Sequence, residues 1–208
     1  MPGVKRIALY GGTFDPVHSG HLEVARKVAE LFELEKVIFI PAQLAPHKVG
    51  RPVTEPIHRY AMLALATQDD AQLVISTFEL DAPNRRYTVD TVAEFQRELG
   101  DETELFFIMG ADSWSEITTW RDWERLLKMT NHIVVTRPGY EMPPAPEGLR
   151  ERIFFTDAVW QDISATDIRR LANEGRYEEL EQLVPQSVAN YIKKYGIYRD
   201  SNEAKLNR

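Results

Sequence analysis

Short runs of apolar residues recur along the chain and alternate with segments of helical periodicity. Six runs rich in β-branched and aromatic residues predict strands, at 7–10, 37–40, 73–75, 105–109, 133–135 and 153–155. Nearly all their residues are apolar, which is typical of strands buried on both faces of a parallel sheet. Apolar residues at helical spacing predict helices between them, over 22–32, 57–65 and 89–95. The alternation indicates the α/β class, with a doubly wound, mainly parallel sheet and helices on both faces.

After about residue 157 the pattern changes to helices alone. Three are predicted, over 164–173, 177–183 and 185–195. Glycines follow the first and the last of them, as is common at helix ends. We expect a small helical C-terminal lobe at about 160–200 within a single domain of residues 1–200, followed by a flexible tail at 201–208.

Composition and charge narrow the classes of function. The chain has no Cys, which excludes disulfides, thiolate metal sites and a Cys nucleophile. The 25 basic and 32 acidic residues give a net charge of −7, which opposes broad attraction to nucleic acid or anionic membrane. No apolar run approaches the ~18 residues that span a bilayer, and no signal-peptide pattern is present. We therefore expect a cytoplasmic protein without nucleic-acid or membrane partners, and leave homo-oligomer formation open.

A glycine-rich loop at 11–21, Gly-Gly-Thr-Phe-Asp-Pro-Val-His-Ser-Gly-His, joins the first predicted strand to a helix. A doubly wound sheet binds ligands at the carboxyl ends of its strands, and glycines and a helix N-terminus there favour a phosphate. The loop lacks the third glycine of G-x-G-x-x-G and the Gly-Lys-Ser/Thr of a P-loop. His18 and His21 share one face of the first helical turn and suit hydrogen bonding to phosphate. A single histidine at a helix start is usually a surface or capping residue. Two histidines on either side of Gly20 favour a functional role instead.

The loop resembles the signature of the nucleotidyltransferase superfamily, a glycine-rich turn followed by H-x-G-H, which is related to a motif of class I aminoacyl-tRNA synthetases. The stretch Ile-Ser-Ala-Thr-Asp-Ile-Arg at 163–169 resembles the second signature of that superfamily. Within it, nearly the whole chain is similar to bacterial nicotinate mononucleotide adenylyltransferases. The resemblance implies a Rossmann-like fold and transfer of the adenylyl group of ATP to nicotinate mononucleotide. It also implies Mg²⁺ carried by the ATP phosphates, without a dedicated metal site.

The resemblance assigns one group of residues to ATP. The residues expected to be catalytic, by contacting or neutralising phosphates, are His18, His21, Lys48 and Arg169. Those expected to bind ATP are Gly11, Gly12, Thr13, Phe14, Gly20, Gly110, Asp112, Arg137, Ser164 and Thr166. Purely structural interpretations stay open for Lys48 as a solvated lysine and for Asp112 and Ser164 as helix caps. Arg170 lies on another helix face and is expected to be solvated.

A second group is assigned to the mononucleotide. Its members are Lys48, Tyr87, Thr88, Trp120 and Arg121. Trp120 would stack on the pyridine ring, whereas Trp123 is expected in the core. Thr88 is also a candidate N-cap, a role that needs no ligand. Arg121 stands where the family more often has an aromatic residue. Either its guanidinium or backbone N–H groups would hold the nicotinate carboxylate, so the preference for acid over amide stays open.

Two other functions remain open. The first is adenylyl transfer to a different acceptor, such as nicotinamide mononucleotide or phosphopantetheine, which would use the same H-x-G-H motif. The second is a noncatalytic nucleotide-binding module, which would need the glycine loop but neither histidine. Ligation of an amino acid to RNA is disfavoured by the net charge of −7 and by the lack of an anticodon-type domain.

Overall fold

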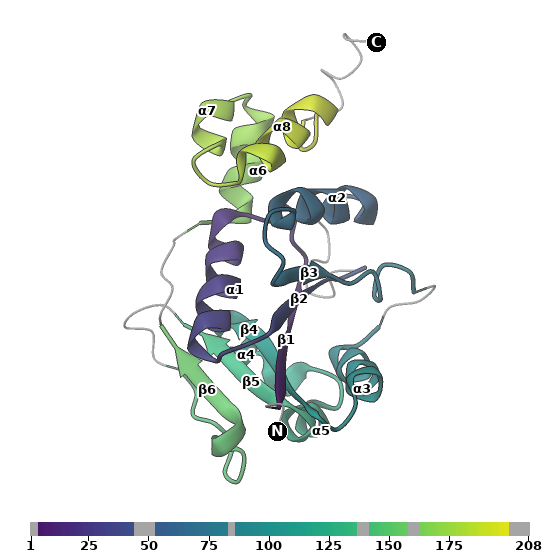
Figure 1. Cartoon of the computed structure of the whole chain (residues 1–208). Coiled ribbons are helices and arrows are strands. Elements are labelled where there is room, and N and C mark those ends of the chain that lie inside the picture. Colours follow the sequence, from purple (N-terminus) through teal and green to yellow (C-terminus); the bar gives the residue numbers. More distant parts are fainter. Residues whose placement is uncertain (1–3, 44–52, 83–85, 137–141, 158–162, 200–208) are drawn as a thin grey trace.

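The computed structural model of the chain describes residues 4–43, 53–82, 86–136, 142–157 and 163–199. Its centre is a six-stranded sheet with the order β3-β2-β1-β4-β5-β6, in which every neighbouring pair is parallel (Figure 1). The strands are β1 (Lys5–Gly12), β2 (Lys36–Pro41), β3 (Leu73–Ile75), β4 (Thr103–Gly110), β5 (Asn131–Val135) and β6 (Ile153–Thr156). All six predicted runs lie in these strands, so the prediction of a doubly wound parallel sheet is confirmed.

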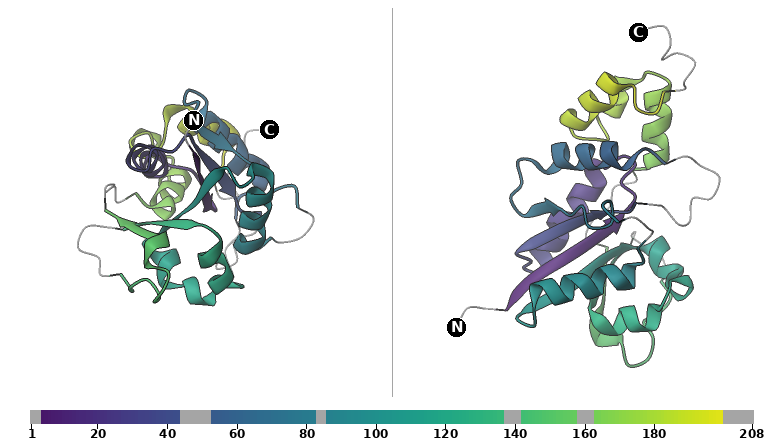
Figure 2. Two further views of the ribbon diagram at one scale, coloured as in Figure 1. Left: turned by 60° about the horizontal axis from the view of Figure 1, so that its bottom comes forward. Right: turned by 90° about the vertical axis from the view of Figure 1, so that its right-hand side faces the viewer.

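Helices cover both faces of the sheet (Figure 2). They are α1 (Ser19–Leu31), α2 (Pro56–Thr67), α3 (Thr88–Leu99), α4 (Ala111–Ser115), α5 (Trp123–Met129), α6 (Ala165–Asn173), α7 (Tyr177–Leu180) and α8 (Gln186–Tyr195). Two 3-10 turns accompany them, η1 (Ile117–Thr119) and η2 (Arg150–Arg152). Within the described part of the chain, no helix combines the length and apolar character needed to cross a membrane.

Successive residues of each central strand face opposite sides of the sheet, and both sides are buried. Ala8 and Phe106 belong to the apolar cluster that includes α1, α2 and the C-terminal helices. Leu9 and Phe107 belong to the second cluster, which includes α3, α4 and α5. This double burial explains why the strand sequences are continuously apolar. Trp123 is partly buried and packs against the second cluster, as expected.

The three C-terminal helices form the predicted lobe at one end of the molecule, with α2 lying between the lobe and the sheet (Figure 2). Ile168, Leu180 and Ile192 of the lobe are fully buried in the same apolar cluster as α1 and α2. The Ser187 hydroxyl of α8 donates a hydrogen bond of 2.9 Å to the Leu65 carbonyl of α2. The lobe therefore shares its core with one face of the sheet. The predicted tail at 201–208 lies outside the described residues.

The strand order reverses between β1 and β4. From β1 the chain continues outward to β2 and β3, and from β4 it continues in the opposite direction to β5 and β6. Sheets of this kind bind ligands in the crevice beyond the carboxyl ends of their strands at such a switch point. β1 ends at Gly12 and β4 ends at Gly110. Both glycine-bearing strand ends therefore border the expected crevice.

Candidate active site

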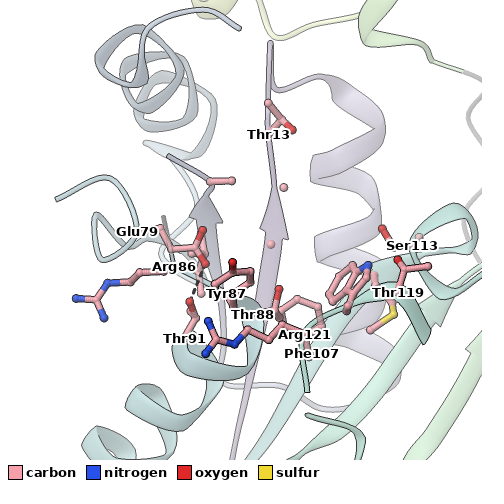
Figure 3. Close-up of a pocket in the computed structure, with 17 residues that line it drawn as sticks. Thr13, Glu79, Arg86, Tyr87, Thr88, Thr91, Phe107, Ser113, Thr119 and Arg121 are labelled. Atoms are coloured by element: carbon pink, nitrogen blue, oxygen red, sulfur yellow. Dashed lines mark hydrogen bonds between the residues drawn. The ribbon is translucent and has the colours of Figure 1, made fainter. Parts of the chain in front are cut away.

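A pocket of about 550 Å³ opens at this switch point. The ends of three central strands contribute to it, through Gly11, Ile40 and Met109 among others. Side chains from the segment before α3 and from α3 itself form one side, and residues of α4 and η1 lie on the other (Figure 3). The pocket is therefore bounded by elements from both halves of the sheet.

Eight of the residues predicted to bind ligands line this pocket. They are Gly11, Gly12, Thr13, Tyr87, Thr88, Gly110, Trp120 and Arg121. They include four of the five residues expected to bind the mononucleotide, and the fifth, Lys48, lies outside the described residues. Arg137, which was expected to bind ATP, also lies outside them. The other described candidates, which do not line the pocket, are Phe14, His18, Gly20, His21, Asp112, Ser164, Thr166 and Arg169.

Aromatic and cationic groups meet in the pocket. The Arg121 guanidinium lies 4.6 Å above the Tyr87 ring. The Trp120 ring meets Phe107 edge-on, with centroids 6.4 Å apart and planes at 85°. The Trp120 Nε1 atom is buried without a hydrogen-bond partner within the described chain. A buried N–H of this kind usually has a partner, and a ligand could supply one here.

Thr91, Glu79 and Arg86 are among the pocket residues that were not predicted from the sequence. The Thr91 hydroxyl of α3 donates a 2.7 Å hydrogen bond to Glu79 Oε1, and burial raises the pKa of the Glu79 carboxyl. Arg86 also lines the pocket and stacks 4.0 Å above the Phe78 ring. Helical spacing from Thr88 could have indicated Thr91, three residues further along α3. Glu79 and Arg86 lie in an irregular segment without any periodic signal.

Two capping interpretations are wrong, and one is confirmed. The N-cap of α3 is Tyr87, so Thr88 is the first helical residue and does not cap the helix. The N-cap of α4 is Gly110, and Asp112 is an exposed first-turn residue. In both cases the helix begins one or two residues earlier than the capping interpretation requires. Ser164 does cap α6, because its hydroxyl accepts a 3.2 Å hydrogen bond from the Thr166 backbone N–H.

The two histidines lie together at the start of α1, on one face as their spacing predicts. Their rings stack with centroids 3.6 Å apart and planes at 27°. The backbone N–H of His18 donates to Nδ1 of His21 at 3.3 Å, so a neutral His21 carries its proton on Nε2. Burial lowers the pKa of His18 to about 4, and its Nδ1 atom has no hydrogen-bond partner within the described chain. His18 is therefore neutral at pH 7.

The glycine turn is shaped by an aromatic ring. Phe14 is 3% exposed and has a left-handed backbone with φ of 48°. Its ring lies 5.1 Å from the His21 ring. A Cβ atom at Gly12 would come within 2.7 Å of that phenyl ring, which no ordinary contact allows. Gly12 is thus required by the packing of Phe14, a reason that the sequence did not show, and Phe14 itself is a core residue.

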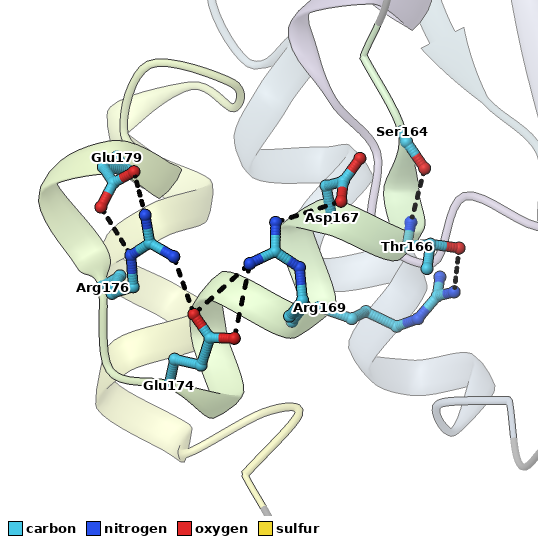
Figure 4. A network of polar contacts seen from close by, with 8 residues as sticks. Ser164, Thr166, Asp167, Arg169, Glu174, Arg176 and Glu179 are labelled. Atoms are coloured by element: carbon cyan, nitrogen blue, oxygen red, sulfur yellow. Dashed lines mark hydrogen bonds and ion pairs between the residues drawn. The ribbon is translucent and has the colours of Figure 1, made fainter.

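The second signature reaches the first through Arg169. Its guanidinium donates to the backbone carbonyl of Asp15 at 2.6 Å and to the Thr166 hydroxyl at 3.0 Å. Figure 4 shows Arg169 on the opposite side of α6 from a row of ion pairs. In that row Arg170 pairs with Asp167 and Glu174 on the exposed surface. Arg169 therefore lies against the glycine-rich loop, whereas Arg170 faces solvent as expected.

The strand order, the glycine-rich turn at its switch point and the adjoining pocket define an α/β nucleotide-binding protein. The family described as Cytidylyltransferase-like matches residues 9–171. A "Probable nicotinate-nucleotide adenylyltransferase" of a Thermoanaerobacter species is 43% identical over 205 residues, covering 95% of this chain and 96% of the relative. A protein of the same name from Thermus thermophilus is 43% identical over 194 residues, covering 93% and 100%. The chain belongs to the cytidylyltransferase-like family and, within it, to the nicotinate-nucleotide adenylyltransferases.

Solved structures share the fold. The Plasmodium falciparum nicotinic acid mononucleotide adenylyltransferase complexed with NaAD superimposes with a TM-score of 0.74 at 20% identity. The alignment covers 93% of this chain and 97% of that chain. The Plasmodium protein complexed with APC gives a TM-score of 0.73. These similarities confirm the Rossmann-like architecture.

Proposed function

We propose that this chain transfers the adenylyl group of ATP to nicotinate mononucleotide, giving deamido-NAD and pyrophosphate in NAD biosynthesis. The observation that carries the proposal is the 43% identity to nicotinate-nucleotide adenylyltransferases over nearly the whole chain. The pocket at the switch point supports it, because an aromatic and cationic lining suits an anionic pyridine nucleotide.

The reaction needs no protein nucleophile. An oxygen of the mononucleotide phosphate attacks the α-phosphorus of ATP in line and forms the new P–O bond. The bond between the α-phosphorus and the oxygen bridging to the β-phosphorus breaks, and pyrophosphate leaves with that electron pair. The protein contributes by aligning the two nucleotides and by stabilising charge on the transferring group.

The pocket binds the acceptor mononucleotide. Trp120 stacks on the pyridine ring, and the Thr88 hydroxyl is available as a hydrogen-bond donor from the start of α3. Arg86 and Arg121 outnumber the single carboxylate, Glu79, among the charged pocket residues that the structure describes. A site with excess positive charge favours an acceptor that carries both a phosphate and a carboxylate.

The glycine turn and the two signatures bind ATP. His18 and His21 donate hydrogen bonds to the phosphates, and Arg169 neutralises charge from the start of α6, where its guanidinium donates to the Thr166 hydroxyl. Ser164 and Thr166 bind ATP at the same helix N-terminus. Gly11, Gly12, Thr13 and Phe14 form the turn beside the phosphates, and Gly20 lets α1 begin next to them. Gly110 at the end of β4 allows a close approach of the nucleotide, and Asp112 in the first turn of α4 binds the ribose. Lys48 and Arg137, outside the described residues, complete the set.

Mg²⁺ enters as part of the ATP substrate. Among the residues that the structure describes, no group of three or more His, Asp or Glu side chains could hold a metal ion. Mg²⁺ usually keeps most of its ligands among phosphate oxygens and water, and ATP supplies those phosphates.

The test is pyrophosphate formation from ATP and Mg²⁺ with nicotinate mononucleotide, nicotinamide mononucleotide or phosphopantetheine, one acceptor at a time. We expect the nicotinate compound to give the highest kcat/KM. A variant with both His18→Ala and His21→Ala is the control for contaminating activity. Higher kcat/KM with another acceptor would reassign the substrate, and ATP binding without turnover on any acceptor would leave a noncatalytic module.

A further inference from the structure

A buried polar cluster adjoins the glycine turn, and Arg169 is the only one of its side chains that the mechanism above uses. At its centre is Asp15, which is 5% exposed. One carboxylate oxygen accepts a 2.8 Å hydrogen bond from the Tyr198 hydroxyl, and the other accepts one of 3.3 Å from the Thr54 backbone N–H. The Asp15 carbonyl accepts the 2.6 Å hydrogen bond from Arg169. A single residue thus joins the turn to three distant segments.

Arg59 of α2 completes the cluster and is fully buried. Its guanidinium donates to three backbone carbonyls, those of Thr54 at 2.9 Å, Thr13 at 2.8 Å and Gln43 at 3.3 Å. Thr13 lines the pocket. A buried guanidinium is costly unless each of its donors is satisfied, and here the carbonyls occupy donors on all three nitrogens. The arrangement therefore determines the position of the turn's backbone.

The C-terminal segment reaches this cluster through one side chain. Tyr198 follows α8 and has a left-handed backbone with φ of 72°, a conformation that is unfavourable for an aromatic residue. Burial and the adjacent Asp15 carboxylate raise the pKa of its hydroxyl, which therefore remains a donor at any physiological pH. Despite this unfavourable backbone, the 2.8 Å hydrogen bond places a donor from residue 198 against residue 15.

From this geometry we infer that Tyr198 is a positioning residue for the ATP half of the site. Its hydroxyl donates a hydrogen bond to the Asp15 carboxylate and so fixes the position of Asp15. Asp15 then determines the backbone path from Thr13 to His18, and its carbonyl accepts the hydrogen bond from Arg169. The inference rests on the proposed function, because it assigns that turn and Arg169 to ATP. Thr13 lines the acceptor pocket, but Asp15, Arg169 and Tyr198 do not, so acceptor binding depends less on this hydrogen bond. The C-terminal lobe therefore contributes to ATP binding indirectly, through Asp15.

Tyr198→Phe tests the inference, because it removes one hydroxyl and keeps the ring. A matched control is Tyr177→Phe in the same lobe, whose buried hydroxyl has no hydrogen-bond partner in the described chain. ATP affinity is measured by calorimetry, and nicotinate mononucleotide affinity by tryptophan fluorescence. We expect Tyr198→Phe to weaken ATP binding by about tenfold, the size of one charge-assisted hydrogen bond, with mononucleotide affinity within about twofold of wild type. Tyr177→Phe should leave both affinities unchanged.

Asp15→Asn provides a second variant and a double-mutant cycle. It keeps the shape of the side chain and weakens the hydrogen bond from Tyr198 by removing the charge. We expect an ATP-selective loss in this variant and, in its background, a smaller effect of Tyr198→Phe than in the wild type. If Tyr198→Phe does not fold, the selective loss in Asp15→Asn carries the test.

The outcomes separate this inference from the proposed function. Equal ATP affinity in the wild type, Tyr198→Phe and Tyr177→Phe would overturn the positioning role. Equal losses for ATP and mononucleotide in Tyr198→Phe would also overturn it, since they indicate a general effect on the fold. A wild-type chain that binds ATP but transfers no adenylyl group overturns the proposed function alone.

Discussion

The protonation of His18 should change when ATP binds, if its imidazole contacts a phosphate. Burial lowers the pKa of this group to about 4 in the unliganded protein. At pH 5.5 a group with that pKa is protonated in only about 3% of molecules. A neighbouring phosphate raises the pKa by roughly 1–3 units, which gives a protonated fraction between about 0.2 and about 1. ATP binding should therefore take up about 0.2–0.9 proton at His18.

Titration calorimetry at pH 5.5 in two buffers of different ionisation enthalpy measures this uptake. The phosphates of ATP also titrate, so the same experiment on His18→Gln supplies the value without the imidazole. We expect proton uptake on ATP binding to be larger in the wild type than in the variant by about 0.2–0.9 proton at pH 5.5. At pH 8 the difference should be less than about 0.1 proton, because the imidazole is almost entirely neutral in both the free and the ATP-bound protein.

Equal proton uptake by the wild type and His18→Gln would refute the phosphate contact. The adenylyl transfer itself would still stand on its own test. If the variant binds ATP too weakly for calorimetry, an NMR titration of the His18 ring in the wild type replaces it. The pKa of the ring should then rise on addition of ATP, and an unchanged pKa contradicts the contact.

Four further expectations concern activity and stability. His21→Ala should lower kcat by about 10²–10³-fold with little change in the unfolding temperature, and near-normal turnover contradicts its role. Arg169→Ala should raise the KM for ATP while the KM for the acceptor stays near wild type; a loss confined to the acceptor would move this residue to the other half of the site. We expect a preference of at least ~10²-fold in kcat/KM for nicotinate over nicotinamide mononucleotide, which Arg121→Ala should narrow if the guanidinium holds the carboxylate. His132 is fully buried, and its folded pKa of about 4 lies below that of the unfolded chain, so stability falls as pH falls through this window. Urea unfolding should show a loss of roughly 2 kcal/mol from this group between pH 7.5 and pH 5. His132→Gln keeps a donor for the Leu126 carbonyl and should reduce that loss, whereas identical pH dependence in both proteins contradicts the reasoning.

The sequence by itself determined the secondary elements of the sheet and the local chemistry of the turn. Strand and helix periods depend on residues close in sequence, so the apolar runs located all six strands. The spacing of His18 and His21 was enough to place both rings on one face. Ser164 was likewise identifiable as a cap from its immediate neighbours. The same local reasoning failed at Thr88 and Asp112, because it did not fix the first residue of either helix.

Only the tertiary structure decided which distant segments meet. The pocket combines residues from the ends of three strands with Glu79 and Arg86, whose own segment carries no periodic signal. Burial of Arg59 on α2 and the reach of Tyr198 to Asp15 depend on strand order and on the docking of the C-terminal lobe. Local patterns do not encode those long-range distances, because they arise from the packing of whole elements against one another.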